Sequence, residues 1–136
     1  MRFSKTTEYA IRVMIYLSQH NTQRLSVQSL HKILRIPYKY LARLMRQLAH
    51  AGLVTVTQGK EGGYSLNREL NSIYLYQIVG VIEGLDSMDR CILGFSECND
   101  AFPCSLHTSW EPLRSRIKEM MYNTTLLELQ QQGEKI

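Results

Sequence analysis

The chain has 136 residues, of which 44% are hydrophobic and 21% charged, a balance that excludes an intrinsically disordered protein. Its longest nearly unbroken apolar run, residues 73–82, is far shorter than the roughly 20 residues of a membrane-spanning helix. The first ten residues also lack the apolar stretch of a signal peptide. We therefore expect a cytoplasmic protein with no membrane partner.

Charge is unevenly distributed along the chain. Residues 1–82 hold eleven Lys and Arg against three Asp and Glu, a local net charge of +8, whereas residues 83–136 hold five against nine, a net of −4. Exposed faces that are merely solvated can produce such a pattern. A basic half is equally typical of a segment that binds a polyanion, joined to a second part with another role.

Three helices are predicted in the first part of the chain. The first runs from about Thr6 to Gln19, because apolar residues recur there at i, i+3, i+4 and i+7. The second begins after Ser26, a typical N-cap, and ends before Pro37, because the residue before a proline disfavours helical geometry. The third can begin with Pro37 as its first residue and stops near Gly52. Two short helices joined by a turn, the second one basic, are typical of a helix-turn-helix.

A β-hairpin is predicted directly after the third helix. Residues 53–57 are rich in β-branched side chains, residues 58–63 are rich in glycine, and residues 64–66 resume the alternating pattern. A helical bundle shares the spacing of the two helices, but it has no such hairpin, or wing. A helix-turn-helix followed by a wing indicates DNA binding. The expected contact residues are Tyr38, Lys39, Tyr40, Arg43, Arg46, Gln58, Lys60, Gly62 and Gly63, with Lys39, Tyr40 and Arg43 in the major groove.

The remaining sequence predicts two further helices separated by an irregular loop. One helix is expected from about Tyr74 to Glu83 with Gly84 as its stop, and another from His107 to about Leu129. Apolar residues of the last helix exceed what so small a domain can cover, which indicates a homodimer helix, although a helix packed only on its own core is the alternative. The expected dimer contacts are Trp110, Leu113, Ile117 and Met121.

The predicted fold is therefore mainly α with a small β-hairpin. It consists of a winged helix-turn-helix DNA-binding domain over residues 1–84, a cysteine-bearing loop over residues 85–106, and a dimerisation helix with a polar tail over residues 107–136. We expect the core of residues 1–82 to be complete without the loop.

All three cysteines lie in the irregular loop, with the spacing Cys91-x6-Cys98-x5-Cys104, and His107 follows three residues later. A reducing cytoplasm argues against structural disulfides. Three alternatives remain: unreactive or singly acting thiols, a zinc site, and an iron–sulfur cluster. Zinc sites usually show a close Cys-x2–4-Cys pair, whereas clusters take thiolates from long loops and accept histidine. If residues 104–107 begin the last helix, Cys104 and His107 share one face and can bind one centre.

Two other classes of protein fit the sequence less well. An electron-transfer protein would use the cysteines but would need neither the wing nor the basic half. An enzyme is not expected, because no nucleophile with its base and no phosphate-binding glycine motif is recognisable. We interpret His20, His31 and His50 as structural.

Several short stretches together resemble the Rrf2 family of bacterial winged-helix regulators. They are Met1-Arg2-Phe3-Ser4 with Glu8-Tyr9-Ala10, Ile36-Pro37 with Tyr40-Leu41, Ala51-Gly52-Leu53-Val54, and Gly59-Lys60-Glu61-Gly62-Gly63-Tyr64-Ser65-Leu66.

The resemblance implies a homodimeric regulator, most simply a repressor, that reads double-stranded operator DNA with inverted half-sites. It further implies an iron–sulfur cluster, 2Fe–2S or 4Fe–4S, on Cys91, Cys98 and Cys104, which senses redox state, nitric oxide or iron–sulfur status. The fourth ligand would be His107 or, as in another branch of the family, the partner's Glu8. Gln58 and Ala42 depart from the residues common in this family, which bears on the operator sequence.

Overall fold

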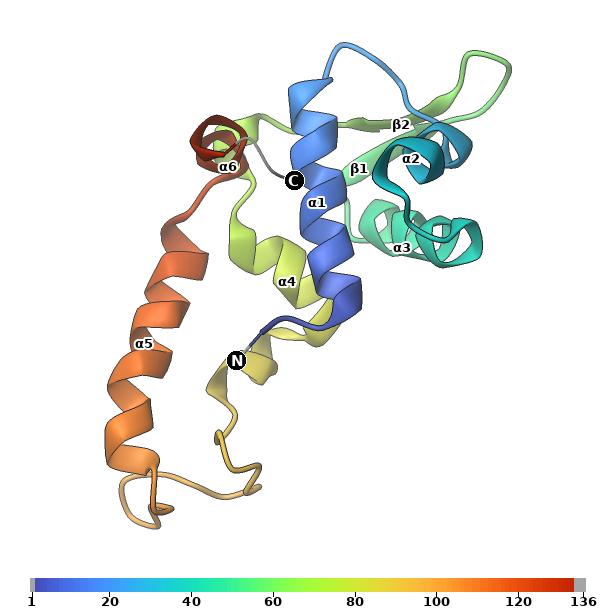
Figure 1. Cartoon of the computed structure of the whole chain (residues 1–136). Helices are drawn as coiled ribbons and strands as arrows, with labels where there is room; N and C mark the ends of the chain where they lie inside the picture. The colour runs from blue at the N-terminus through green and yellow to red at the C-terminus, as the bar shows by residue number, and fades with distance from the viewer. Residues whose placement is uncertain (1, 134–136) are drawn as a thin grey trace.

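The computed structural model describes residues 2–133 and shows a mainly helical chain with one antiparallel hairpin, which confirms the predicted fold class (Figure 1). No helix among these residues is long and apolar enough to cross a membrane. The elements are α1 Lys5–Gln19, α2 Val27–Leu34, α3 Tyr38–His50, β1 Val54–Thr57, β2 Gly63–Leu66, the 3-10 helix η1 Leu70–Ser72, α4 Leu75–Glu83, the 3-10 helix η2 Leu85–Asp89, α5 His107–Asn123 and α6 Leu126–Gln132.

The helix-turn-helix consists of α2 and α3, with Ser26 as the predicted cap of α2, but α3 begins at Tyr38 and not at Pro37. The Ser26 hydroxyl caps α2 by accepting a hydrogen bond from the backbone N–H of Ser29 at 3.1 Å. Arg35 ends α2 in the left-handed conformation (φ 56°), and its N–H donates to the carbonyl oxygen of His31. Pro37 occupies the cap position of α3, one residue before the helix begins. Only a short turn separates the two helices.

The hairpin is joined to the rest of the domain by a third backbone segment. Tyr64 pairs with Val56 within the hairpin and forms a second bridge with Leu25, with N–O distances of 2.8 and 2.9 Å. Gly63 lies against the same backbone, and a Cβ atom there would come within 2.8 Å of the carbonyl carbon of Leu25. The close approach of the two segments therefore requires glycine at this position.

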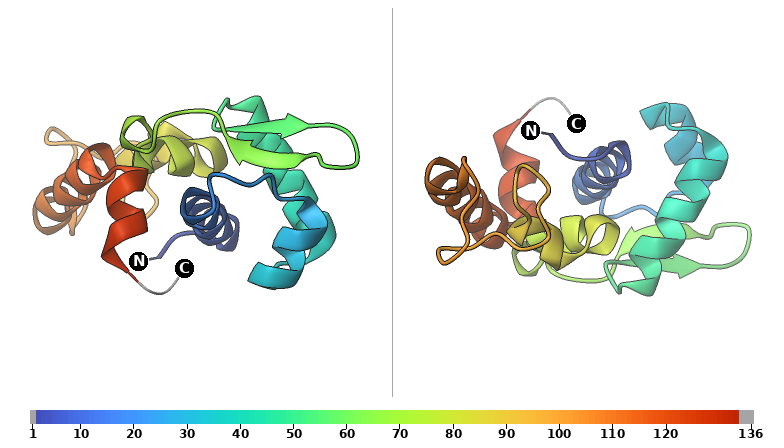
Figure 2. Two further views of the ribbon diagram at one scale, coloured as in Figure 1. Left: turned by 90° about the horizontal axis from the view of Figure 1, so that it is seen from above. Right: turned by 90° about the horizontal axis from the view of Figure 1, so that it is seen from below.

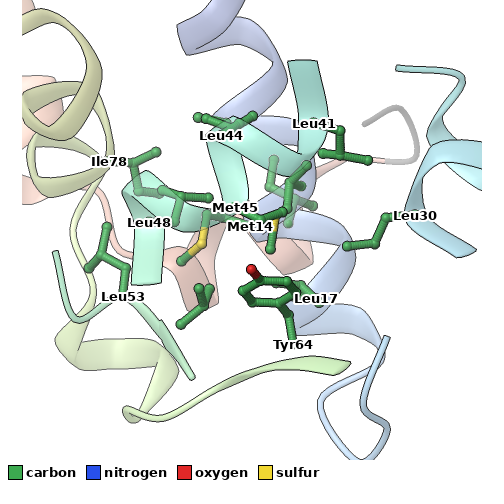
Figure 3. Packing of buried hydrophobic residues seen from close by; sticks show 14 of the residues in the cluster. Met14, Leu17, Leu30, Leu41, Leu44, Met45, Leu48, Leu53, Tyr64 and Ile78 are labelled. Carbon is green, nitrogen blue, oxygen red and sulfur yellow. The ribbon is translucent and has the colours of Figure 1, made fainter. Parts of the chain in front are cut away.

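One apolar cluster contains side chains from helices α1, α2, α3, α4 and α6 and from both strands of the hairpin. Figure 3 shows side chains from several of these elements meeting in its interior. Leu126 of α6 is fully buried in this cluster, so the core of the DNA-binding part also includes a residue from the C-terminal region. Its largest fully buried members are Met14, Leu17, Leu30, Ile36, Leu41, Leu44, Met45, Leu48, Leu53, Ile73, Ile78 and Leu126.

The helix expected to run from His107 to about Leu129 is shorter than predicted and ends at Asn123. Backbone pairing to a distant segment interrupts it: Thr124 accepts a hydrogen bond from the N–H of Leu75 at 2.9 Å. The Thr125 hydroxyl then caps α6, which packs against α1 and η1. The polar tail expected from residue 130 onwards is helical to residue 132, and residues 134–136 lie outside the described part of the chain.

Helix α5 extends along the side of the molecule away from the hairpin (Figures 1 and 2). It packs against α4 and η2 through a second, smaller apolar cluster. This cluster consists of Leu75, Val79, Met88 and Met121, with Ile117 among the partly buried residues against it. The cysteine-bearing loop connects η2 to the N-terminal end of α5 (Figure 1).

Candidate metal centre and nucleic-acid interface

The loop brings the three cysteines together. The sulfur atoms of Cys91, Cys98 and Cys104 all lie within 4.8 Å of one another, and those of Cys91 and Cys104 are 3.6 Å apart. Two local turns cause this convergence. One begins at Cys91, whose carbonyl oxygen accepts from the N–H of Gly94, and the other is closed by Asn99. All three thiols are half-buried.

His107 lies at the edge of this group. Its Nδ1 atom is 3.5 Å from the sulfur of Cys98, and its Nε2 atom is 2.9 Å from the carboxylate of Asp100. Helix α5 begins at His107, so Cys104 precedes the helix and does not share a helical face with it. A turn in which the N–H of His107 donates to the carbonyl oxygen of Cys104 brings the two residues together instead. The imidazole consequently faces Cys98.

The pKa values of Cys91 and Cys98 are shifted in opposite directions. Burial would raise the pKa of Cys91, but hydrogen bonds from the backbone N–H groups of Phe95 and Leu93, with help from the other two thiols, lower this pKa to about 7. The backbone N–H of Cys104 donates to the sulfur of Cys98 at 3.4 Å and favours its thiolate, but burial and the two neighbouring thiols together raise the pKa of Cys98. Cys91 therefore becomes a thiolate, the form that binds metals, more readily than Cys98 does.

The arrangement fits a metal centre bound by sulfur. A Zn–thiolate bond is about 2.3 Å long, so two thiolates on one metal ion lie at most about 4.6 Å apart. The 3.6 Å between Cys91 and Cys104 meets this limit, and the 4.8 Å spread of all three also suits several metal ions bridged by sulfide. His107 adds a nitrogen donor beside Cys98.

Glu8, the alternative fourth ligand, does not belong to this cysteine group within its own chain. It lies in the first turn of α1 and forms ion pairs with Arg2 and Lys5, each at 3.2 Å, and hydrogen bonds from these two cations lower its pKa. Together with Trp110 and Arg90 it borders a cavity of about 450 Å³ between the N-terminal segment and α5.

The predicted dimer residues divide between two sides of α5. Met121 is buried and Ile117 is partly buried against the second apolar cluster of their own chain. Trp110 is half-buried, and its Nε1 atom has no hydrogen-bond partner among the described residues. Leu113 is different, because 56% of it is exposed. Met120, seven residues further along, is 50% exposed and lies on the same side of the helix as Leu113. The sequence pattern did not distinguish this exposed side from the side that packs on its own chain.

Helix α3 exposes a row of basic side chains. Lys39, Arg43 and Arg46 are all exposed and lie opposite the buried stripe of the helix. His50, interpreted from sequence as structural, is also exposed and continues the row at i, i+4, i+7 and i+11. Such a row can meet DNA phosphates and base edges along one groove.

The two tyrosines at the start of α3 are placed differently from that row. Tyr38 is exposed and its ring lies edge-on to that of His31. The Tyr40 hydroxyl shares a hydrogen bond with the hydroxyl of Thr6, and its ring lies edge-on to Tyr9 with centroids 5.5 Å apart. Tyr40 thus connects α3 to α1, a role that its place in the recognition helix did not predict.

The tip of the hairpin exposes Gln58 and Lys60, as a DNA-contacting wing requires. Gly62 closes the turn, because its N–H donates to the carbonyl oxygen of Gly59, and a Cβ atom on Gly62 would lie 2.1 Å from the carbonyl oxygen of Thr57. Backbone crowding is a sufficient reason for glycine at this position and, as described above, at Gly63.

A helix-turn-helix with a basic outer row, followed by a hairpin that exposes Lys60 at its tip, defines a winged-helix regulator of transcription that binds DNA. The chain belongs to the Rrf2 family: the family model, described as an iron-dependent transcriptional regulator, matches residues 3–132.

Known relatives agree with this assignment. An HTH-type transcriptional regulator of Aquifex aeolicus is 31% identical over 131 residues, which are 95% of this chain and 91% of the relative. The HTH-type transcriptional regulator IscR of Vibrio campbellii is 29% identical over 135 residues, or 98% of this chain and 80% of IscR. Among solved structures, CymR, the global cysteine regulator of B. subtilis, has a TM-score of 0.80 at 27% identity and covers 98% of this chain and 99% of CymR. These proteins are regulators, not enzymes.

Proposed function

We propose that this regulator binds an iron–sulfur cluster on Cys91, Cys98 and Cys104 and represses transcription according to redox state, nitric oxide or iron–sulfur status. The convergence of three half-buried sulfur atoms within 4.8 Å carries the proposal. The family's description as iron-dependent and the similarity to IscR support it. A bound cluster would supply a redox-active centre.

The fourth ligand in this proposal is His107. Its Nδ1 atom is a side-chain nitrogen 3.5 Å from the sulfur of Cys98, and its ring is largely buried beside the cysteines. The alternative is the partner's Glu8. Within one chain Glu8 is engaged by Arg2 and Lys5, so ligation by it would compete with two ion pairs.

The proposed DNA complex contains a homodimer on an operator with inverted half-sites. Because bacterial DNA lies in the cytoplasm, we also propose that the protein acts there. Lys39, Arg43 and Arg46 of each recognition helix would face a major groove, and Lys60 of each wing would approach the phosphates or the minor groove. The exposed line through Leu113 would lie at the dimer interface. Recognition helices of such a dimer face successive major grooves about 34 Å apart.

A series of contacts offers a route from the cysteine loop to α5. Asp89 lies two residues before Cys91, and its carboxylate accepts from the ammonium group of Lys118 at 2.6 Å. The Arg114 guanidinium donates to the carbonyl oxygen of Asp89 at 2.7 Å. Any change in the path of the loop at Cys91 would therefore act on two residues of α5, beside the proposed dimer interface.

The same loop is linked to the recognition helix through α4 and α1. Glu83, at the end of α4, accepts hydrogen bonds from the backbone N–H of Ser4 at 3.0 Å and from the Thr7 hydroxyl at 2.7 Å. Thr6, between them, shares a hydrogen bond with Tyr40 of α3. We infer that ligand-induced order in the loop alters the position of α3 through these contacts.

One observation favours a second candidate, a thiol-based regulator. The sulfur atoms of Cys91 and Cys104 are in non-bonded contact at 3.6 Å, so an approach of about 1.5 Å would bring them to the roughly 2.05 Å of a disulfide bond. A peroxide could accept the two electrons and two protons released when these thiols join, and be reduced to water or an alcohol.

Anaerobic purification followed by visible spectroscopy and assays for iron, sulfide and zinc separates these functions. The proposal predicts a coloured protein with iron and acid-labile sulfide in equal amounts. A colourless protein with stoichiometric zinc would contradict the sensor function. A colourless protein without metal, which forms a reversible disulfide between Cys91 and Cys104, would support the thiol-based regulator instead.

A further inference from the structure

An exposed carboxylate contacts the far side of the His107 ring. The Nε2 atom of His107 lies 2.9 Å from the carboxylate of Asp100, and the opposite nitrogen, Nδ1, lies 3.5 Å from the sulfur of Cys98. The imidazole side chain is only 10% exposed, whereas that of Asp100 is fully exposed. The ring is thus held between a thiol on its inner side and a carboxylate on its outer side.

The carboxylate determines which nitrogen carries the proton. An ionised carboxylate only accepts hydrogen bonds, so Nε2 must donate to Asp100. In the neutral ring Nδ1 is then an unprotonated acceptor, and its lone pair is directed at Cys98. This tautomer is the one that a metal bound beside Cys98 requires of His107.

Asp100 lies in a hydrogen-bonded turn. The side-chain oxygen of Asn99 accepts hydrogen bonds from the backbone N–H groups of Ala101 at 2.9 Å and Phe102 at 3.0 Å. These bonds close a loop around Asp100, which lies between Cys98 and Cys104 in the sequence. These hydrogen bonds restrain the backbone that carries the Asp100 carboxylate.

We propose that Asp100 is a positioning residue, which orients His107 as an Nδ1 ligand and fixes its tautomer. The inference rests on the proposed cluster, because it assigns the atom through which His107 would bind. Hydrogen bonds from a ligating histidine to a carboxylate orient the ring and raise the basicity of the ligand. Asp100 itself need not touch the metal.

The first test measures the His107 tautomer directly. Nitrogen-15 NMR of the cluster-free protein should show the proton on Nε2 in the wild type and a mixture of tautomers, or the proton on Nδ1, in Asp100→Ala. Asp100→Asn keeps an oxygen acceptor and should keep the Nε2–H form. A matched control is Glu97→Gln, which alters an exposed acid in the same loop. An Nδ1–H tautomer in the wild type, or a tautomer that Asp100→Ala leaves unchanged, would overturn the inference.

The second test uses the reconstituted protein. Asp100→Ala should lose its visible absorption in air about ten times faster than wild type, the lower end of the range for loss of such a partner. Asp100→Asn should raise the reduction potential, because a negative charge near the centre is removed, and Asp100→Glu should restore wild-type behaviour in part. Wild-type decay and potential in all Asp100 variants would contradict a positioning role. If the wild type takes up no cluster, the proposed function fails, but the NMR result still decides the role of Asp100.

Discussion

The sulfur atoms of Cys91 and Cys104 lie 3.6 Å apart, although the two residues are 13 positions apart in the chain. Replacing either of them, or Cys98, with Ser should therefore abolish the visible absorption and the bound iron, since no other thiol in the chain can substitute. The fold of the DNA-binding part should persist, because its core contains none of the three. Iron assay and circular dichroism measure the two effects separately.

His107→Ala serves as the comparison for the cysteine variants. It should keep part of the colour and bleach faster, because water or a nearby side chain can occupy one position, and His107→Cys should stabilise the cluster at a lower potential. If His107→Ala matches wild type while Glu8→Ala loses the cluster, the fourth ligand is the partner's Glu8. Full iron content in all three cysteine variants would contradict the site itself.

Arg43 lies in the middle of the exposed basic row of α3. Arg43→Ala should weaken operator binding by about 1–3 kcal/mol and relax the sequence preference, if the guanidinium reads a base. Lys60→Ala should weaken binding to all DNA alike and reduce the salt slope by about one, as expected for a phosphate contact. Fluorescence anisotropy with operator and random DNA distinguishes these outcomes.

Arg116→Ala is the control for both DNA-contact variants, because it removes an exposed positive charge from α5, on the side of the molecule away from the hairpin. It should bind operator nearly as wild type does. Unchanged binding in Arg43→Ala and Lys60→Ala would move the DNA interface to another face.

Leu113 and Met120 are exposed on one line of α5. Aspartate at both positions should give a monomer in sedimentation experiments, because two charges would be buried in the proposed dimer interface. The monomer should retain its helicity, because neither side chain belongs to the core of its own chain. Specific DNA binding should fall sharply, whereas a dimer that persists in the double variant would place the interface elsewhere.

Glu83 predicts a defined acid sensitivity. Burial would raise its pKa, but hydrogen bonds from Ser4 and Thr7 outweigh burial and lower it below 4.5. The charged carboxylate therefore stabilises the fold at pH values above about 4.5, and this contribution is lost as pH falls through the lower, folded-state pKa. Glu83→Gln should cost about 1–3 kcal/mol of unfolding free energy at pH 7, the usual range for a hydrogen bond to a charged group.

Urea denaturation at pH 7 and at pH 3 measures this effect. The difference between wild type and Glu83→Gln should shrink at the lower pH, where a larger fraction of the Glu83 carboxylate is protonated. Glu69→Gln, which alters an exposed acid, should change stability little at either pH. A gap between wild type and Glu83→Gln that does not depend on pH would mean that the charge is unimportant.

The sequence predicts the parts of this fold that local rules determine. Ser26 and Pro37 mark the limits of α2, and Gly84 ends α4, because caps and prolines act on neighbouring backbone. Periodicity in residues 87–106 is too weak to indicate the path of the loop, and the chemistry of the three cysteines leaves several alternatives open. Family resemblance supplied the remaining support for a shared site.

Contacts between distant segments could not be anticipated. Helix α5 ends where Thr124 pairs with Leu75, and the apolar pattern continues through that break without a signal. The hydrogen bond between Tyr40 and Thr6 likewise depends on how α1 packs against α3. Asp100 has no distinguishing feature in the sequence, and the role proposed for it rests on its contact with His107.

The most direct test of the account compares DNA affinity with and without the cluster in one preparation. Operator sequences selected from a random oligonucleotide pool are titrated with anaerobically purified protein, and then with the same protein after a chelator has removed its iron. If the cysteine loop acts on α3 and α5 as proposed, affinity for the operator should change by at least about fivefold, the lower end of typical coupling between sites. Equal affinity of the two forms, at matched dimer content, would contradict a sensing role for Cys91, Cys98 and Cys104.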